Sequence, residues 1–314
     1  MKKTLFVVLL LLSAGVLAQP FPSRRVTFVS GVTPGSASDT MARILADKLQ
    51  AKWGQPVIVE NKLGAGGLVG AKYVAQSEPD GHTIMMYASA FTVSTLLSPE
   101  VMNPKELQAV AMVATIPTIL VAPPEKGYKN VADLVAAAKK TPGGLVCSNA
   151  GIGSATHMNL ERFRFSAGIE VVSIPTKGVS EALTEVISGR ADCYFALVFQ
   201  AKRMADAGKV VALAAGSPKR SSLMPEVPTT LELGYANSDY NFWVGALVPS
   251  KTPREVVDKL HADITGLVES AEIVEQIRKL GCDPLPMSVR EFEALIQREL
   301  AENAELIKKA RITN

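Results

Sequence analysis

The amino-acid sequence predicts an α/β protein that is divided into two lobes. Apolar runs of the β type alternate with runs of helical spacing along almost the whole chain, which is typical of α/β proteins. The chain has 314 residues. After removal of a predicted leader at residues 1–18, it is still long enough for about two domains of ordinary size. Two glycine-rich segments, PGSASD at 34–39 and AGIGSATH at 150–157, each lie between a predicted strand and a predicted helix. Their separation along the chain predicts one such turn in each lobe.

The N-terminal residues have the pattern of a secretory signal peptide over 1–18. Lys2 and Lys3 precede an apolar run at 5–12, and small residues up to Ala18 suit cleavage before Gln19. The apolar run is shorter than the roughly 20 residues that a membrane span requires. No cysteine follows the cleavage site directly, so we expect neither membrane insertion nor a lipid anchor.

The β pattern recurs in order along the chain. We expect strands near 26–30, 57–60, 83–87, 110–121, 145–148, 169–174, 191–197, 210–215 and 242–248. The helices between them have recognisable ends. Asn130 is a candidate N-cap with Asp133 in the first turn, and TPGG at 141–144 ends that helix.

Two capping boxes are predicted near the C-terminus. Thr252, Pro253 and Glu255 have the residue types of an N-cap and of the first and third helical positions. Ser288 and Glu291 repeat the box. We therefore expect one helix to begin after Thr252 and the last helix to begin after Ser288.

Two long apolar runs are candidates for a hinge. No low-complexity linker divides the chain, and the runs at 110–121 and 242–248 are each followed closely by a proline. This pattern suits extended segments that cross from one lobe to the other. We therefore expect residues 19–120 and 243–314 to form lobe 1 and residues 121–242 to form lobe 2.

The charge and the cysteines exclude several classes of protein. The formal net charge of +3 falls to about +1 without the two leader lysines, which does not indicate a nucleic-acid or acidic-membrane surface. Cys147, Cys193 and Cys282 cannot all pair and lack the spacing of a metal or redox motif. We favour buried, hydrophobic roles for all three. A Cys147–Cys193 bridge stays open, because both residues fall in predicted strands.

The two glycine-rich segments are candidate anion sites. The first N–H groups of a helix lack intrahelical partners, and the helix dipole is positive at that end. A carboxylate or a phosphate is stabilised there without any basic side chain. We therefore expect a ligand with charged groups to be held between the two segments.

Five segments of the chain carry a resemblance to a known family. They read VTFVSGVTPGSASDTMARILADKL, GQPVIVENKLGAGGLVGAKYVAQSEPDGHTI, NAGIGSATHMN, TKGVSEALTEVISGRAD and MPEVPTTLELG. In this order the chain resembles the TctC-like extracytoplasmic solute receptors, also called Bug proteins, which serve tripartite tricarboxylate transport systems. The resemblance runs from about Phe21 to the C-terminus.

The resemblance implies a type II periplasmic-binding-protein fold, with two α/β lobes joined by crossing hinge strands and a ligand cleft between them. It implies a periplasmic, monomeric protein that binds without chemistry and without a cofactor or metal. The expected ligand is a small carboxylate, either a di- or tricarboxylate or an aromatic acid. The expected partners are the membrane permease subunits of the transporter. Main-chain amides of the two glycine-rich loops hold the carboxylate in this family.

The family's ligand positions can be carried over to this chain residue by residue. The positions in lobe 1 are Val32, Thr33, Gly35, Ser36, Ala37, Asp39, Gly66, Gly67 and Ser89, and those in lobe 2 are Gly151, Gly153, Ser154, Thr156, His157, Thr176, Lys177 and Phe195. Three of them also suit a structural role. Asp39 and Ser154 are candidate helix caps, and His157 suits a structural histidine nearly as well as a ligand donor.

The chain departs from the family pattern at several of these positions. The family usually has an aromatic residue at Val32, a glycine at Ser36 and a tyrosine at Thr176. After Asp192 it usually has an aspartate and an asparagine, where this chain reads CYFALVFQ. These changes predict a wider cleft that receives an ammonium group less readily, which argues against an amino-acid ligand.

A hydrolase and a sensor subunit are the two alternative function classes. The chain has no GxSxG, HExxH, CxxC or P-loop motif, and its three histidines are scattered. A hydrolase would have to use Ser154 and His157, for which no orienting acid is apparent. A periplasmic sensor subunit is the nearer alternative, since a sensor and a transporter would both recognise lobe closure.

Overall fold

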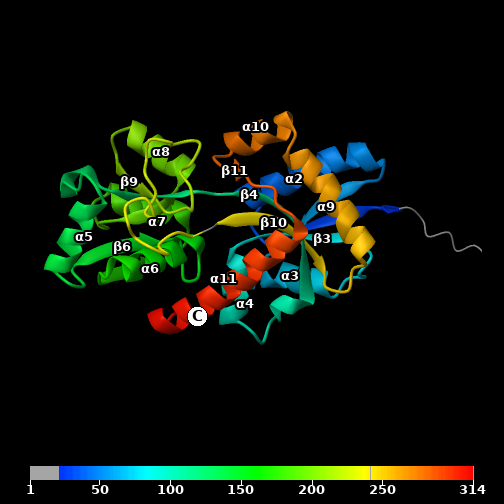
Figure 1. Cartoon of the computed structure of the whole chain (residues 1–314), viewed down its shortest axis with the longest axis horizontal. Helices are drawn as coiled ribbons and strands as arrows, with labels where there is room; N and C mark the ends of the chain where they lie inside the picture. The colour runs from blue at the N-terminus through cyan, green and yellow to red at the C-terminus, as the bar shows by residue number, and fades with distance from the viewer. Residues whose placement is uncertain (1–20, 241, 314) are drawn as a thin grey trace, which may run out of the picture.

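The computed structural model describes residues 21–240 and 242–313, so the predicted leader lies outside the described residues. Two bodies of sheet and helix stand side by side (Figure 1). In the first, β3 (Thr83–Ala88), β1 (Val26–Ser30) and β2 (Val57–Asn61) are parallel neighbours. The sheet continues through β10 (Trp243–Pro249), β4 (Leu107–Thr115) and β11 (Asp283–Pro284), and its order is β11-β4-β10-β3-β1-β2.

Helices cover both faces of this first sheet. They are α2 (Ala37–Trp53), α3 (Leu68–Ala75), α4 (Ala90–Leu97), α9 (Arg254–Val268), α10 (Ala271–Lys279) and α11 (Val289–Ala310), with short 3-10 turns η1 (Ala65–Gly67) and η2 (Pro104–Glu106). One core, around Phe28, Leu45 and Leu260, lies under α2 and α9. The other core, around Tyr87, Phe91 and Phe292, lies under α3, α4 and α11. Two buried faces explain why the strands are almost continuously apolar.

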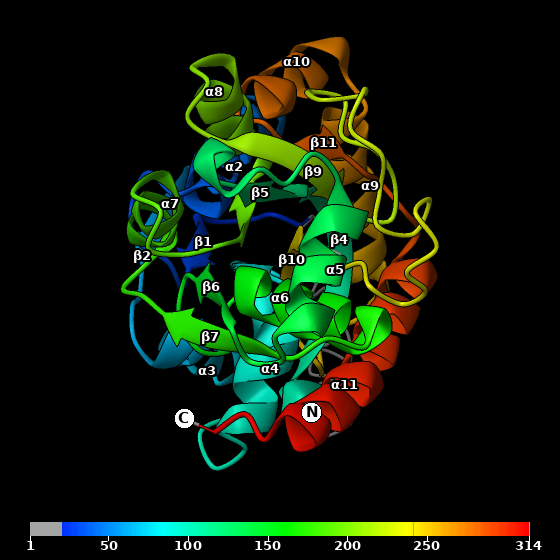
Figure 2. The ribbon, with the colours of Figure 1, turned by 90° about the vertical axis from the view of Figure 1, so that its left-hand side faces the viewer.

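The second body contains two small sheets. β5 (Thr118–Ala122) pairs antiparallel with β8 (Tyr194–Leu197) and β9 (Val211–Ala215), and β6 (Leu145–Asn149) pairs parallel with β7 (Val171–Pro175). The helices here are α5 (Val131–Lys140), α6 (Ala155–Ala167), α7 (Val179–Ile187) and α8 (Val198–Asp206), with the short turn η3 (Pro124–Lys126). Figure 2 views the molecule from this side, with α6 in front and α4 and α11 below it.

A disulfide joins the two small sheets. The sulfur atoms of Cys147 in β6 and Cys193 beside β8 are bonded, with their Cα atoms 4.6 Å apart, and both residues are buried. The favoured prediction of three unpaired buried cysteines was therefore wrong for these two, because pairing depends on a strand adjacency that spacing does not reveal. Cys282 is free and buried.

The predicted strand over 110–121 was wrong in one respect. The structure divides it into β4 and β5, which lie in different sheets, at Ile116 and Pro117. Pro117 has no N–H group, so it cannot continue a ladder. The Ile116 N–H donates instead to the carbonyl of Phe242 at 2.7 Å. The two crossing segments therefore run side by side where the chain passes between the sheets.

These crossings define the two lobes in broad outline. Strands up to Thr115 and from Trp243 onward lie in the first sheet, and strands from Thr118 to Ala215 lie in the other two. We keep the names lobe 1 and lobe 2 for these bodies. The boundaries at residues 120 and 242 stay a prediction.

The predicted helix ends had mixed outcomes. Asn130 caps α5 by accepting from the Asp133 amide, and Ser288 with Glu291 forms a complete capping box on α11, so both predictions are confirmed. The box at Thr252 was wrong. There the N-cap of α9 is Pro253, in an extended conformation, and no side chain caps it. The Thr252 amide is used in a turn with the carbonyl of Pro249, which delays the helix by one residue.

Candidate functional site

Two loops begin at the carboxyl ends of parallel strands, one in each lobe. The first loop (residues 31–36) links β1 to α2, and the second loop (residues 150–154) links β6 to α6. Carboxyl ends of strands in α/β sheets are the usual place for ligand sites. Both loops coincide with the glycine-rich segments singled out in the sequence.

The first loop is closed by a helix cap. Ser36 is the N-cap of α2 and accepts a hydrogen bond from the Asp39 amide at 3.4 Å. The Gly35 N–H donates to Asp39 Oδ2 at 2.9 Å. Gly35 has a φ of +80°, a conformation that favours glycine. The cap is thus Ser36, whereas Asp39 holds the loop from within the helix.

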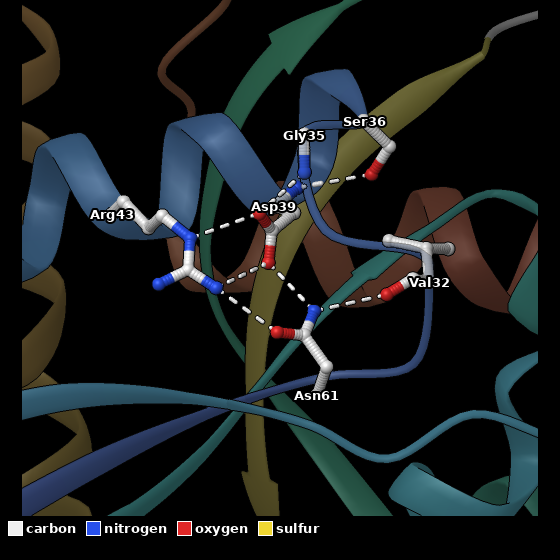
Figure 3. Close-up of polar contacts among 6 residues, drawn as sticks. All are labelled: Val32, Gly35, Ser36, Asp39, Arg43 and Asn61. Atoms are coloured by element: carbon white, nitrogen blue, oxygen red, sulfur yellow. Dashed lines mark hydrogen bonds and ion pairs between the residues drawn. The ribbon is translucent and has the colours of Figure 1, made fainter.

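A polar cluster of Asp39, Arg43 and Asn61 fixes the position of this loop (Figure 3). Arg43 Nε lies 3.0 Å from Asp39 Oδ2, and Arg43 Nη2 donates to Asn61 Oδ1 at 2.9 Å. Asn61 Nδ2 donates both to Asp39 Oδ1 at 2.7 Å and to the carbonyl of Val32 at 3.0 Å. The cluster therefore holds the loop at both of its ends.

The Asp39 carboxylate is committed to this structural role. Burial of Asp39 would raise its pKa, but hydrogen bonds from Arg43, Gly35 and Asn61 outweigh burial and hold the pKa below its usual range. Its side chain is fully buried. We therefore assign Asp39 to positioning the first loop and not to ligand contact. Asn61 was missed in the sequence, although it lies within the GQPVIVEN motif.

Four amides at the starts of α2 and α6 are without acceptors. Within the described residues, the N–H groups of Ala37 and Ser38 in α2 donate to no protein atom, and the same holds for Ala155 and Thr156 in α6. These are the positions at which a helix leaves its donors unused. Each helix therefore presents two N–H groups at its positive end.

The second loop uses its own amides internally. The Gly151 N–H donates to Asn149 Oδ1 at 2.9 Å, and the Ala150 N–H donates to Thr156 Oγ1 at 3.0 Å. The Gly153 N–H donates to His157 Nδ1 at 3.2 Å. The glycines thus shape the loop, and the donors left for an anion are those of the helix start that follows.

His157 holds the second loop, and its burial disfavours the charged form of the ring. Burial lowers the pKa of its imidazole, and the Glu161 carboxylate only partly opposes this effect. Because Nδ1 accepts from Gly153, the ring proton lies on Nε2, which is 3.9 Å from Glu161 Oε1. Ser154 caps α6 by accepting from the His157 amide at 3.2 Å. His157 therefore fits a structural role, which is the alternative to ligand contact that the sequence suggests.

Three buried hydroxyl groups close to the ends of strands make no hydrogen bond of good geometry with the described residues, although the Tyr240 side chain lies near Ser89 and the Thr156 side chain lies near Tyr194. They are Ser30 Oγ at the end of β1, Ser89 Oγ directly after β3, and Tyr194 Oη in β8. All three residues are fully buried, and an unpaired buried hydroxyl is costly. Only Ser89 was expected from the sequence. The position of Ser30 immediately before the first loop was an available signal, whereas nothing in the sequence marked Tyr194.

The other expected residues have varied positions. Gly66 lies in η1, where its carbonyl accepts from the Tyr87 hydroxyl at 2.6 Å, and a Cβ on Gly67 would overlap the Tyr87 ring. Thr176 donates to the carbonyl of Asn149 at 2.9 Å, which joins its loop to the second loop. Lys177 is exposed.

Phe195 lies outside the loop region. It is fully buried in the core of lobe 2 and makes an edge contact with Phe163, with ring centroids 5.7 Å apart. Tyr194, its neighbour, points to the opposite core of the same sheet. The alternation of side chains along a strand explains the difference. We therefore leave Phe195 out of the proposed site.

The two lobes touch near the loops. A Cβ on Gly153 would lie 3.2 Å from Val93 Cγ1 and 3.1 Å from Leu97 Cδ1 of α4. Val179 and Leu197 of lobe 2 pack against the core of lobe 1 that contains α2. The second loop therefore lies against lobe 1.

The hydrolase alternative finds no support in the geometry. Ser154 Oγ accepts from the His157 backbone and lies 3.1 Å from Thr156 Oγ1, while the His157 ring bonds to Gly153. Within the described residues, no group of three or more histidine, cysteine or acidic side chains is placed to hold a metal ion. None of the helices in that part of the chain is long and apolar enough to cross a membrane.

Several known proteins are similar to this chain in sequence or in structure. A protein encoded between tcbD and tcbE in Pseudomonas sp. strain P51 is 33% identical over 264 residues, which are 83% of this chain and 79% of that protein. The structure of Rpa4515 from R. palustris with adipate is 26% identical, with a TM-score of 0.79, over 93% of this chain and 99% of that one. MatC from Rhodopseudomonas palustris with bound malate is 26% identical, with a TM-score of 0.74, over 91% and 100% of the two chains.

These matches confirm the two-lobed periplasmic-binding-protein fold. The family of tripartite tricarboxylate transporter receptors matches residues 41–312. It is a family of solute-binding receptors and not a class of enzymes. The match covers the second loop (150–154), whereas the first loop (31–36) precedes it. The chain therefore belongs to the tripartite tricarboxylate transporter receptor family.

Proposed function

We propose that this protein captures a small dicarboxylate between its two lobes and delivers it to a tripartite tricarboxylate transporter. One carboxylate would bind at the start of α2 and the other at the start of α6. The adipate and malate of the two related structures are both dicarboxylates. The ligand would be bound without chemical change.

One observation carries this proposal. The unused N–H groups of Ala37 and Ser38 belong to lobe 1, and those of Ala155 and Thr156 belong to lobe 2. Backbone donors at a helix start stabilise an anion, so a ligand with a carboxylate at each end can satisfy both pairs at once. A ligand with a single charge would leave one pair without an acceptor.

The buried hydroxyl groups support the same site. Ser30 ends β1 and Ser89 directly follows β3 in lobe 1, and Tyr194 belongs to lobe 2. Each can donate one hydrogen bond to a carboxylate or to a ligand hydroxyl. A bound polar ligand would offset the cost of burying them unpaired.

The place of action follows from the family. We propose that residues 1–18 direct the chain to the periplasm and that lobe 1 (19–120 and 243–314) closes on lobe 2 (121–242) around the ligand. Permease subunits in the membrane would then recognise the closed form. A sensor subunit that presents the closed form to a signalling partner is the second candidate, since it needs the same closure.

A thermal-shift screen of carboxylic acids tests the proposal. A ligand that binds only the folded state raises its stability by about 2.7 kcal/mol at a hundredfold excess over Kd. We expect dicarboxylates to raise Tm more than the matching monocarboxylates at equal concentration. If sugars or cations raise Tm and no carboxylate does so, the proposed function is wrong.

A further inference from the structure

The last helix, α11, belongs to lobe 1 at its start and contacts lobe 2 at its end. Phe292, Leu295 and Ile296 pack in a core of lobe 1. Leu306 instead packs in a small cluster that contains Met158 of α6. Figure 1 shows α11 running from the first sheet toward the helices of lobe 2. A single rigid helix therefore spans both lobes.

In lobe 2, Arg162 is the central residue of this contact. Its Nη2 lies 3.0 Å from Glu302 Oε2 and donates to Asn303 Oδ1 at 3.1 Å. Its guanidinium carbon lies 5.4 Å from the centre of the Tyr240 ring, beside the second crossing segment. The Arg162 side chain is 13% exposed, so solvent screens these contacts less than those of an open surface pair.

The contact continues to the candidate site inside lobe 1. Asn303 Nδ2 donates to Thr92 Oγ1 at 3.0 Å, and Thr92 Oγ1 donates to the carbonyl of Ser89 at 2.8 Å. Asn303, Thr92 and Ser89 are fully buried. A chain of hydrogen bonds therefore joins Arg162 of lobe 2 to Ser89, whose unpaired hydroxyl is part of the proposed site.

We propose that the contact of Arg162 with Glu302 and Asn303, here called the α6–α11 junction, holds the two lobes close together and so raises ligand affinity. Arg162 lies two turns after the start of α6 that supplies the second pair of free amides. While the junction is formed, the same helix keeps Met158 packed with Val93 of lobe 1. Arg162 is thus a positioning residue that acts at a distance from the ligand.

The effect on affinity follows from the population of closed molecules. If the junction is broken, more of the ligand-free protein has its lobes apart, and the apparent Kd rises in proportion. Coupling energies between distant sites are commonly equivalent to about 5-fold to 150-fold in affinity. For one partly exposed junction we expect a rise near the lower end, about 5-fold to 10-fold.

The test compares three variants of the full mature protein. Arg162→Met removes the charge and keeps an apolar stem, and Glu302→Gln weakens the same contact from the exposed side. Arg298→Met is the matched control, because Arg298 lies 3.8 Å from Glu302 but is 63% exposed on α11. Small-angle scattering without ligand gives the separation of the lobes. Calorimetry with the dicarboxylate found in the thermal-shift screen gives Kd.

We expect both junction variants, but not Arg298→Met, to have a larger radius of gyration without ligand and a raised Kd. The double variant with Arg162→Glu and Glu302→Arg should restore part of both losses. If Arg162→Met and Glu302→Gln match Arg298→Met in both measurements, the inference is wrong. The affinity part rests on the proposed function, whereas the scattering part does not. A larger radius in a protein that binds no carboxylate would support the junction and refute the function.

Discussion

The indole Nε1 of Trp243 donates a hydrogen bond to Glu299 Oε2 at 2.8 Å, in the interior of the protein where β10 meets α11. Both side chains are buried. Burial raises the pKa of Glu299 to about 8, because its effect outweighs the lowering of the pKa by the Trp243 hydrogen bond and by nearby Arg162. The carboxyl group is therefore mostly protonated at neutral pH, beside the segment that crosses between the lobes.

A pH dependence of stability follows from this shift. The folded state keeps a proton on Glu299, whereas the unfolded state loses this proton above about pH 4.5. The free energy of unfolding therefore falls as pH rises from about 4.5 to about 8. The slope from one group is at most about 1.4 kcal/mol per pH unit. Glu299→Gln keeps an acceptor for Trp243 and should remove this slope. Urea denaturation of both proteins between pH 5 and 8.5 measures it, and parallel curves would contradict the prediction.

Loss of Asn61 should weaken both ligand binding and the fold. Asn61→Ala removes the bonds to Val32 and Asp39 that hold the first loop, each worth about 1 kcal/mol. We expect Kd for the dicarboxylate to rise roughly tenfold as the loop becomes less ordered. Asn130→Ala is the control, because it removes the cap of the distant α5 and should cost about 1 kcal/mol of stability alone. Equal Kd values for the two variants would exclude a positioning role for Asn61.

Ser154 should contribute to both stability and affinity. Ser154→Ala removes the cap of α6, which costs about 1 kcal/mol of stability, and a lost bond to a charged ligand would add about 1.5–3 kcal/mol to the binding free energy. Ser270→Ala removes the equivalent cap of α10 and should lower Tm without changing Kd. Calorimetry decides between the two roles. An unchanged Kd in Ser154→Ala would leave the residue as a cap only.

Acid should loosen the second loop through His157. Burial lowers the pKa of its imidazole, so the folded state resists the proton that the unfolded state takes up below about pH 6.5. Stability should therefore decline as pH falls from 6.5 toward the lowered pKa, and protonated Nδ1 can no longer accept from Gly153. His157→Asn offers an oxygen acceptor that does not titrate. Binding measured as the pH falls below 6.5 toward the lowered pKa should weaken in the parent protein and stay level in the variant, and the reverse result would contradict the prediction.

Much of the fold could be predicted because its signals are local. The strand at 26–30 and the caps at Asn130 and Ser288 depend on residues within one or two turns, and the structure confirms them. The division of the run at 110–121 depends on which sheet each half joins, and that partner lies far away in the sequence. The apolar pattern alone cannot distinguish one long strand from two collinear ones.

The site was harder to predict than the fold. Both loops were found from glycine and from helix starts, but the roles within them depend on tertiary hydrogen bonds. Asp39 becomes a positioning residue because Asn61 and Arg43 reach it. Ser30 and Tyr194 stand out only because they make no hydrogen bond of good geometry with the described residues. Whether a polar side chain is satisfied is a property of its surroundings, which no residue type encodes.

The disulfide between Cys147 and Cys193 bears on how this protein can be produced. Cys147 lies in the strand that ends at the second loop, and Cys193 lies next to β8 of the neighbouring sheet. Protein made in a reducing cytoplasm would lack this bond, so the two small sheets would be joined there by side-chain packing and by hydrogen bonds such as the Ser148 amide to the Cys193 carbonyl. In material refolded from such a source, the start of α6 with its free amides would be held less firmly. Ligand affinities measured on that material would be lower than those of the oxidised protein.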